Sequence, residues 1–428
     1  MAVRWKNDPQ LMQIAEWPPV YGAIYGGALI LGLSPLVTAH LLTSLFSGLI
    51  IVLAGKISLK LTEDPLSAMF SSILVLFAPL PLWLSASMLS EPLYVVIALV
   101  MCLLFLQWLQ HGKQTWLLLT TLFCCLLTMT RLESWPLAFF LSLAILYRER
   151  NKKGLLNVLL IYAFPILWAL TSWERFGHPL AVVKDHALDS QVFYLNTPNK
   201  HWLIMLGYLK YFPITLISFS WILFSRQANK KTKWFGIASF VALVTQFIFT
   251  WNHIPTVFPE RVTILPGILG LILSGIFLRN CFHSPSRRIF KLASMILAFS
   301  VFLGNLYFIT QFRPSYRKDM AELGLKLKNS QDWKQKAKSL LIGSDLESHE
   351  LPVMAIMSGF PEVFRYVFFD PQSSRLLLPY SNPPQMFLLK SIPATQILLR
   401  SNPRLVATKI ESVMVVSEFP NLHLEISK

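Results

Sequence analysis

Charged residues stand at the ends of apolar segments in this chain. Glu91 lies in SEPLY and Arg131 in TRLES, each at the junction of two apolar runs, while Arg261 opens another run in FPERVTILPG, shortly after His253. Ionisable groups at a membrane boundary are costly unless they meet water, a partner or a ligand. A carboxylate can take a proton and an arginine can hold a phosphate. Together these residue types could bind a phosphate and take a proton.

The composition indicates an integral membrane protein. Hydrophobic residues make up 54% of the 428, charged residues only 14%, and the mean hydropathy is +0.52. Soluble domains carry about 25% charged residues. The net charge of +16 does not form one basic patch, because the lysines and arginines cluster between apolar runs. We therefore expect no nucleic-acid partner.

The fold class that we expect is mainly α, a polytopic membrane protein with about ten transmembrane helices. A helix needs about 20 apolar residues to cross a bilayer. The predicted spans are 36–55, 65–86, 92–110, 115–130, 132–148, 155–173, 203–225, 234–251, 262–279 and 289–311.

The loops between these spans alternate in charge, which predicts the topology. By the positive-inside rule, the basic loops face the cytoplasm. They carry Lys56 and Lys60; Lys113; Arg148, Arg150, Lys152 and Lys153; Arg226, Lys230, Lys231 and Lys233; Arg279, Arg287, Arg288 and Lys291. Residues 87–91, 131, 174–202, 252–261 and the tail after 311 then lie on the outer side of the plasma (inner) membrane. Glu91, Arg131, Arg261, His253 and His178 all fall on this outer side.

The segment WPPVYGAIYGGALILGL, residues 17–33, precedes the first predicted span. It either crosses the membrane or lies at the outer interface. Its length, its four glycines and its Pro-Pro-aromatic start favour an interfacial helix.

The chain changes character after residue 311. A polar helical pattern is followed by short apolar segments such as YVFFD, RLVATKIES and SVMVVSEF, which are typical of strands. We therefore expect two domains, a multi-span domain over 1–311 and a small soluble extracytoplasmic α/β domain over 312–428.

Simpler roles are open for the outer charges. Glu91 could be a solvated loop charge, and Arg131 could bond the carbonyl groups of a helix end. Glu133, two residues after Arg131, is expected to be solvated. The histidines His253 and His178 could be ordinary hydrogen-bonding residues at the interface.

The order of these motifs resembles a known family. WPPVYGAIY, APLPLWLSASMLSEPLY, LTMTRLESWP, RFGHPL and ERVTILPG follow one another as in the GT-C superfamily of membrane glycosyltransferases. The most similar groups are the family 39-like protein mannosyltransferases and lipid A aminoarabinose transferases. The resemblance covers roughly residues 16–275, and Val262 replaces the aromatic residue that usually follows the arginine.

The resemblance implies a sugar donor carried on a polyprenyl phosphate and inversion at the anomeric carbon. It assigns the donor phosphate to Arg261, with Arg131 in support, and gives Glu91 the task of orienting the acceptor or organising the arginines. Tyr21 belongs to the Pro-Pro-x-Tyr motif, and His253 and His178 are weaker candidates for substrate binding. The acceptor would be a protein, a lipid or a polysaccharide. Some superfamily members use a divalent metal, but the sequence shows no ligand cluster that demands a metal, and we expect no other cofactor.

The chain departs from the family at its start. In the family, a span and a large outer loop with the catalytic aspartate precede the Pro-Pro helix, whereas here only 16 residues do. Asp8 is the candidate replacement for that base. An incomplete N-terminus would explain the same difference, as would a silent relative that acts as a subunit or scaffold. A transporter or flippase of lipid-linked saccharide is the remaining alternative, and it should show internal repeats, which the sequence lacks.

Overall fold

The structure is a computed structural model of the whole chain. It describes residues 19–81, 90–179, 200–225, 228–252 and 262–283, together with residues 303 and 324–325 and short strands beyond 341. The chain divides into two compact units, Met1–Pro314 and Ser315–Lys428.

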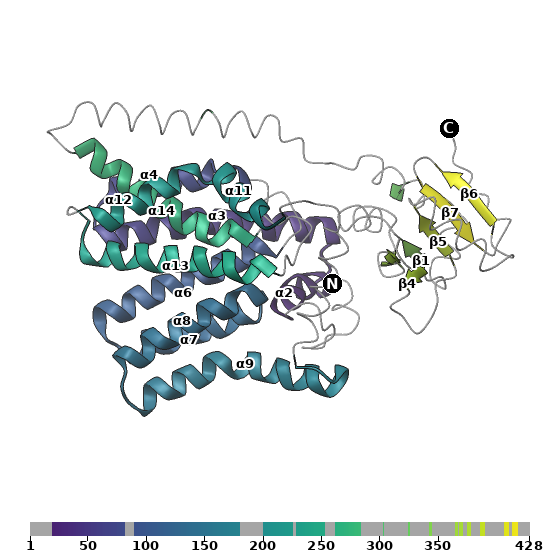
Figure 1. Cartoon of the computed structure of the whole chain (residues 1–428), viewed down its shortest axis with the longest axis horizontal. Coiled ribbons are helices and arrows are strands. Elements are labelled where there is room, and N and C mark those ends of the chain that lie inside the picture. The colour runs from purple at the N-terminus through teal and green to yellow at the C-terminus, as the bar shows by residue number, and fades with distance from the viewer. Residues whose placement is uncertain are drawn as a thin grey trace. The chain divides into compact units, whose positions relative to one another are not determined.

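The first unit consists of helices that lie side by side, with α9 at one margin next to α7 and α8 (Figure 1). Its described helices are α2 (Pro19–Ile30), α3 (Pro35–Thr62), α4 (Pro65–Leu76), α6 (Glu91–His111), α7 (Gln114–Thr128), the 3-10 helix η1 (Leu132–Ser134), α8 (Trp135–Arg148), α9 (Lys152–Phe176), α11 (Lys200–Tyr211), α12 (Pro213–Phe224), α13 (Lys230–Asn252) and α14 (Ile264–His283).

Within the described residues, four helices are long and apolar enough to cross a membrane. They are α3, α6, α9 and α14, over Val37–Thr62, Glu91–His111, Lys152–Glu174 and Ile264–Phe282. A fifth span is added if the bent pair α11 and α12 is counted as one. The chain is therefore a multi-pass membrane protein. Of the predicted span 289–311, the structure describes residue 303 alone.

The prediction of one continuous span over 203–225 is wrong. The chain turns by 92° between α11 and α12, at Phe212 and Pro213. Proline has no N–H to donate and is favoured at the start of a helix, so Pro213 ends one helix and begins the next. A hydrogen bond of 2.7 Å between the hydroxyls of Thr215 and Tyr208 joins the two helices across the bend.

The helix α2 is 12 residues long. At a rise of about 1.5 Å per residue it measures about 18 Å, too short to cross a hydrocarbon core of about 30 Å. This length agrees with the interfacial position expected from the sequence.

The core of this unit lies around α14, which packs against α3, α4, α12 and α13. Leu271, Ile272 and Leu273 are all buried because α14 is apolar on every side, as expected of a helix inside a bundle. A Cβ atom at Gly275 would overlap Ser71, so glycine permits α4 to approach. The Ser71 hydroxyl donates to the Ile272 carbonyl at 3.0 Å across this contact.

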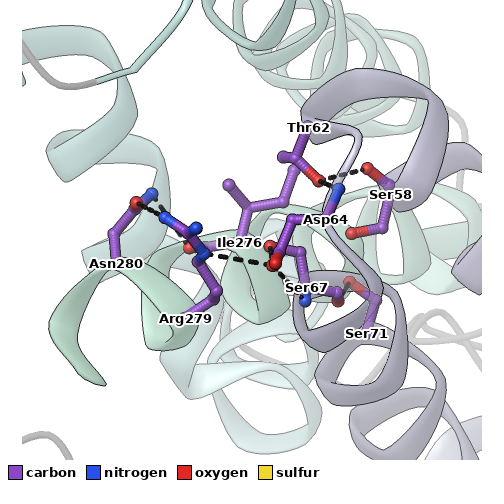
Figure 2. A network of polar contacts seen from close by, with 8 residues as sticks. All are labelled: Ser58, Thr62, Asp64, Ser67, Ser71, Ile276, Arg279 and Asn280. Carbon is purple, nitrogen blue, oxygen red and sulfur yellow. Dashed lines mark hydrogen bonds and ion pairs between the residues drawn. The ribbon is translucent and has the colours of Figure 1, made fainter. Parts of the chain in front are cut away.

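A polar cluster joins the turn between α3 and α4 to the end of α14 (Figure 2). Asp64 caps α4 by accepting from the Ser67 amide at 2.8 Å, and its carboxylate pairs with Arg279 Nε at 3.1 Å. Nearby, the Asn229 side chain donates to the Leu61 carbonyl at 2.8 Å and accepts from the Thr232 amide, which attaches α13 to the end of α3. Three of the basic connections therefore meet at one end of the unit.

The second unit contains a mixed sheet. Its described strands are β1 (Ile342–Ser344), β2 (Phe364–Tyr366), β3 (Phe368–Asp370), β4 (Arg375–Leu377), β5 (Met386–Leu389), β6 (Val406–Ile410) and β7 (Val413–Ser417). Five strands are ordered β2-β1-β5-β7-β6, and β3 pairs with β4. The strand β1 runs parallel to β2 and β5, whereas β7 runs antiparallel to β5 and β6. The predicted segments RLVATKIES and SVMVVSEF become the hairpin of β6 and β7.

Candidate functional site

Arg131 lies at the centre of a buried charge cluster. Its Nη1 donates to Glu91 Oε1 at 2.6 Å and to the Ser90 hydroxyl at 3.1 Å. Its Nη2 and Nε donate to the two oxygens of Glu133, at 2.6 and 3.1 Å. One guanidinium therefore bridges two carboxylates, and its contact with Glu133 is bidentate, the geometry in which arginine binds carboxylates most strongly.

Three local structures hold these side chains in place. Glu91 is the first residue of α6, where the helix dipole favours a negative charge. Arg131 is extended, with φ −152° and ψ 142°, between the end of α7 and η1. The Ser134 hydroxyl bonds the Leu127 and Arg131 carbonyls at 3.0 and 2.6 Å and so closes the turn. The cluster thus joins two turns that are 40 residues apart in the sequence.

The cluster is almost fully shielded from solvent. Glu91 is 0% exposed, and Arg131 and Glu133 are each 6% exposed. Burial acts to lower the pKa of Arg131, but the carboxylates of Glu133 and Glu91 outweigh it and raise that pKa, so the guanidinium stays charged. With both carboxylates ionised, the three side chains carry a net charge of −1. Such a group is better suited to hold hydroxyls than to hold phosphate.

The helix α2 is attached beside this cluster. The Val20 amide donates to the Met129 carbonyl at 3.1 Å, two residues before Arg131. One turn apart on α2, the rings of Tyr21 and Tyr25 are in contact, with centroids 4.3 Å apart and their planes tilted by 34°. Tyr25 also packs against Phe46 of α3, with centroids 6.4 Å apart.

The structure brings two predicted site residues together, Glu91 and Arg131, and places Tyr21 on the neighbouring helix, half-buried. His178 is exposed and follows Gly177, which ends α9, and its backbone carbonyl accepts from the Ser172 hydroxyl at 2.9 Å. Asp8, His253 and Arg261 lie outside the described residues.

Two expectations for this turn are wrong. Glu133 is not solvated but buried, with Arg131 bound to its carboxylate. The alternative role of Arg131, bonding helix-end carbonyls, is also not observed, because its guanidinium donates to Ser90, Glu91 and Glu133.

Sequence reasoning missed Glu133, Ser90 and Tyr25. The spacing Arg131-x-Glu133 at a tight turn was the available signal for the first, and the Ser-Glu-Pro helix start was the signal for the second. No sequence signal singled out Tyr25.

The described residues contain no group of three histidine, cysteine, aspartate or glutamate side chains that could hold a metal ion. Glu91 and Glu133 are already bound by Arg131, so this part of the chain offers no set of ligands for a divalent metal.

Comparisons with known proteins bear on the fold. No protein-family model matches the chain, and no curated protein matches it in sequence. Among solved structures, ArnT from Cupriavidus metallidurans bound to undecaprenyl phosphate matches with a TM-score of 0.60 at 14% identity, over 98% of this chain and 92% of that one. The archaeal oligosaccharyltransferase AglB from Archaeoglobus fulgidus, in complex with an inhibitory peptide and a dolichol-phosphate, matches with a TM-score of 0.52 at 12% identity, over 85% of this chain and 59% of that one.

ArnT is a lipid A aminoarabinose transferase and AglB is an oligosaccharyltransferase, and both belong to the GT-C superfamily. At 12–14% identity the similarity concerns the fold. The resemblance expected from the sequence motifs is confirmed at this level, and the chain has the GT-C fold.

Proposed function

We propose that this chain transfers a sugar from a polyprenyl-phosphate carrier to an acceptor hydroxyl at the outer face of the plasma (inner) membrane. The main observation in support is the buried carboxylate of Glu91, oriented by Arg131 at the start of α6. A similar fold carries undecaprenyl phosphate in one solved structure and dolichol-phosphate in another.

The position of the cluster agrees with an outer-face site. Glu91 begins α6, whereas Arg148, from a predicted cytoplasmic loop, donates to the Leu109 carbonyl near the other end of the same helix. The 21 residues of α6 span about 31 Å, close to the thickness of a hydrocarbon core. The cluster and the basic loop thus lie at opposite ends of a helix long enough to cross the membrane.

In the proposed reaction, the acceptor oxygen attacks the anomeric carbon and forms a new glycosidic bond. The bond between that carbon and the phosphate oxygen breaks, and the phosphate leaves on its lipid with the bonding electrons. A carboxylate takes the proton of the acceptor hydroxyl. Asp8 is the candidate for this base, and Glu91 orients the acceptor.

The contacts within the cluster change the role of Arg131 from the one that the resemblance implies. Arg131 is neutralised by two carboxylates, so we assign it to holding Glu91 in place and not to the phosphate. The leaving phosphate requires fixed positive charge. Arg261 keeps this role in the proposal, and Tyr21, His253 and His178 remain candidates for substrate binding.

Substitution of Glu91 tests the proposal. In liposomes with mannosyl undecaprenyl phosphate as donor, Glu91→Gln should reduce transfer about 100-fold or more, the usual scale for a lost proton-transfer or orienting carboxylate. The variant should still insert and accumulate, because Arg131 keeps its bidentate contact with Glu133.

The matched control is Glu174→Gln, since Glu174 is an exposed carboxylate at the end of α9. This variant should transfer at the wild-type rate. Wild-type protein that transfers no sugar would contradict the proposed activity, and full activity in Glu91→Gln would remove Glu91 from the site.

A further inference from the structure

The Tyr25 side chain is buried, and its hydroxyl has no hydrogen-bond partner within the part of the chain that the structure describes. The residue is 2% exposed. A buried tyrosine hydroxyl usually finds a partner, because an unpaired polar group loses its hydrogen bonds to water and gains none in return. An unpaired hydroxyl in such a position is therefore a candidate contact for a ligand.

The environment of Tyr25 fixes its ring beside the charge cluster. The ring packs between Tyr21 and Phe46, and the amide of Val20 anchors α2 to Met129. Burial raises the pKa of Tyr25, and the neighbouring Tyr21 and the charge of Glu91 raise it further. Glu91 thus acts on Tyr25 electrostatically, although the hydroxyl of Tyr25 makes no hydrogen bond to it.

The chemistry around Tyr25 selects the kind of ligand. The guanidinium of Arg131 is engaged by the carboxylates of Glu91 and Glu133, so it is not available to hold a phosphate. A phenol hydroxyl and a carboxylate can instead bind a neutral hydroxyl between them, because the phenol can donate or accept and the carboxylate accepts. Sugars supply such hydroxyls.

We propose that Tyr25 is a specificity-determining residue whose hydroxyl binds a hydroxyl of the substrate beside Glu91. The substrate hydroxyl belongs to the sugar carried by the donor or to the acceptor. The proposal rests on the proposed function and adds a residue to Tyr21, the tyrosine of the Pro-Pro-x-Tyr motif.

The test compares wild-type protein with Tyr25→Phe, which removes only the hydroxyl. Without ligand, Tyr25→Phe should unfold at the same temperature as wild type or higher, because an unpaired buried hydroxyl is lost. Binding is measured in detergent micelles with two probes, undecaprenyl phosphate and its mannosyl derivative. Wild type should prefer the mannosyl lipid, and Tyr25→Phe should lose about threefold to tenfold of this preference, the equivalent of one neutral hydrogen bond.

Tyr208→Phe is the matched control, since Tyr208 is also buried but its hydroxyl is bonded to Thr215. This variant should unfold at a lower temperature and keep the lipid preference.

The outcomes separate the sources of the hydroxyl. A lost preference for the mannosyl lipid assigns Tyr25 to the donor sugar. An unchanged preference with a threefold to tenfold slower transfer assigns it to the acceptor. Unchanged binding and transfer in Tyr25→Phe, with an active wild type, would overturn the role of Tyr25 alone. Wild-type protein that neither prefers nor transfers the mannosyl group would contradict the proposed function, and the role of Tyr25 with it.

Discussion

At the scale of single residues, Arg131 is the central member of the charge cluster, because its buried guanidinium pairs with both Glu91 and Glu133. Removing one partner of a buried ion pair leaves an uncompensated charge, which costs about 3–5 kcal/mol. Arg131→Met would remove the cation that pairs with both buried carboxylates, Glu91 and Glu133, so we expect a loss of about this size. The apparent free energy of unfolding in mixed detergent micelles, followed by tryptophan fluorescence, measures it.

Arg148→Met is the control at this scale. Arg148 is exposed, stacks over the Trp108 ring at 4.9 Å and donates to the Leu109 carbonyl. Arg148→Met should lower the free energy of unfolding much less than Arg131→Met does, because water can solvate the Leu109 carbonyl that loses its partner. Equal losses in the two variants would show that the buried cluster does not depend on its central charge.

Residue types at the membrane boundary were enough to predict two members of the cluster, Glu91 and Arg131. The contact between Arg131 and Glu133 was not predicted, since it depends on the short helix η1 that turns Glu133 back onto Arg131. The expectation that Glu133 is solvated was wrong because it assumed an open loop. The short helix η1 instead forms a closed turn, in which Glu133 is buried against Arg131.

At the scale of elements, the junction of α3, α4 and α14 depends on Asp64. Burial acts to raise the pKa of Asp64, but hydrogen bonds from Ser67 and the charge of Arg279 outweigh it and lower that pKa. A group whose pKa is lowered by folding stabilises the protein above its unfolded pKa, about 3.9 for aspartate, and loses that effect as the pH falls further. Asp64→Ala should therefore cost stability at pH 7 and cost less as the pH falls through this range.

Asp64→Asn separates the two contributions of this residue. Asparagine still caps α4 but cannot pair with Arg279, so it should lose less than alanine, for which the missing cap alone costs about 0.5–2 kcal/mol. Thermal unfolding midpoints at pH 7 and near pH 3.5 measure the differences between the variants. A gap between wild type and Asp64→Ala that stays constant with pH would exclude the ionised carboxylate as the cause.

The positions of helices along the chain could be predicted from the lengths of the apolar segments, but bends within those segments could not. The predicted spans 92–110 and 262–279 match α6 and α14 closely. The prediction for 203–225 is a single helix, because the segment stays apolar through Phe212 and Pro213 and hydropathy contains no information on the direction of the helix axis. The bend of 92° depends on the Tyr208–Thr215 contact and on the packing of Phe212 against α14, where a Cβ at Gly267 would overlap its ring.

For the whole molecule, the charge pattern predicts the orientation, and the positions of the charged groups in the fold agree with it. Three basic connections meet around Asp64 and Asn229, while Glu91 and Arg131 lie at the other end of α6 from Arg148. Positive loops stay in the cytoplasm because translocating clustered lysine and arginine is unfavourable. The orientation remains a prediction, and with it the extracytoplasmic placement of residues 312–428.

Cysteine labelling in intact cells decides the orientation. The four native cysteines, Cys102, Cys124, Cys125 and Cys281, are replaced first, and single cysteines are then introduced at Lys152, Lys231, Asn196 or Ser373. A membrane-impermeant maleimide should label the variants at Asn196 and Ser373, and it should label those at Lys152 and Lys231 only after the membrane is opened. The opposite pattern would place Glu91 and Arg131 in the cytoplasm, where the proposed outer-face reaction has no place. Protection at Ser373 alone would leave the site outside and move only the second unit across the membrane.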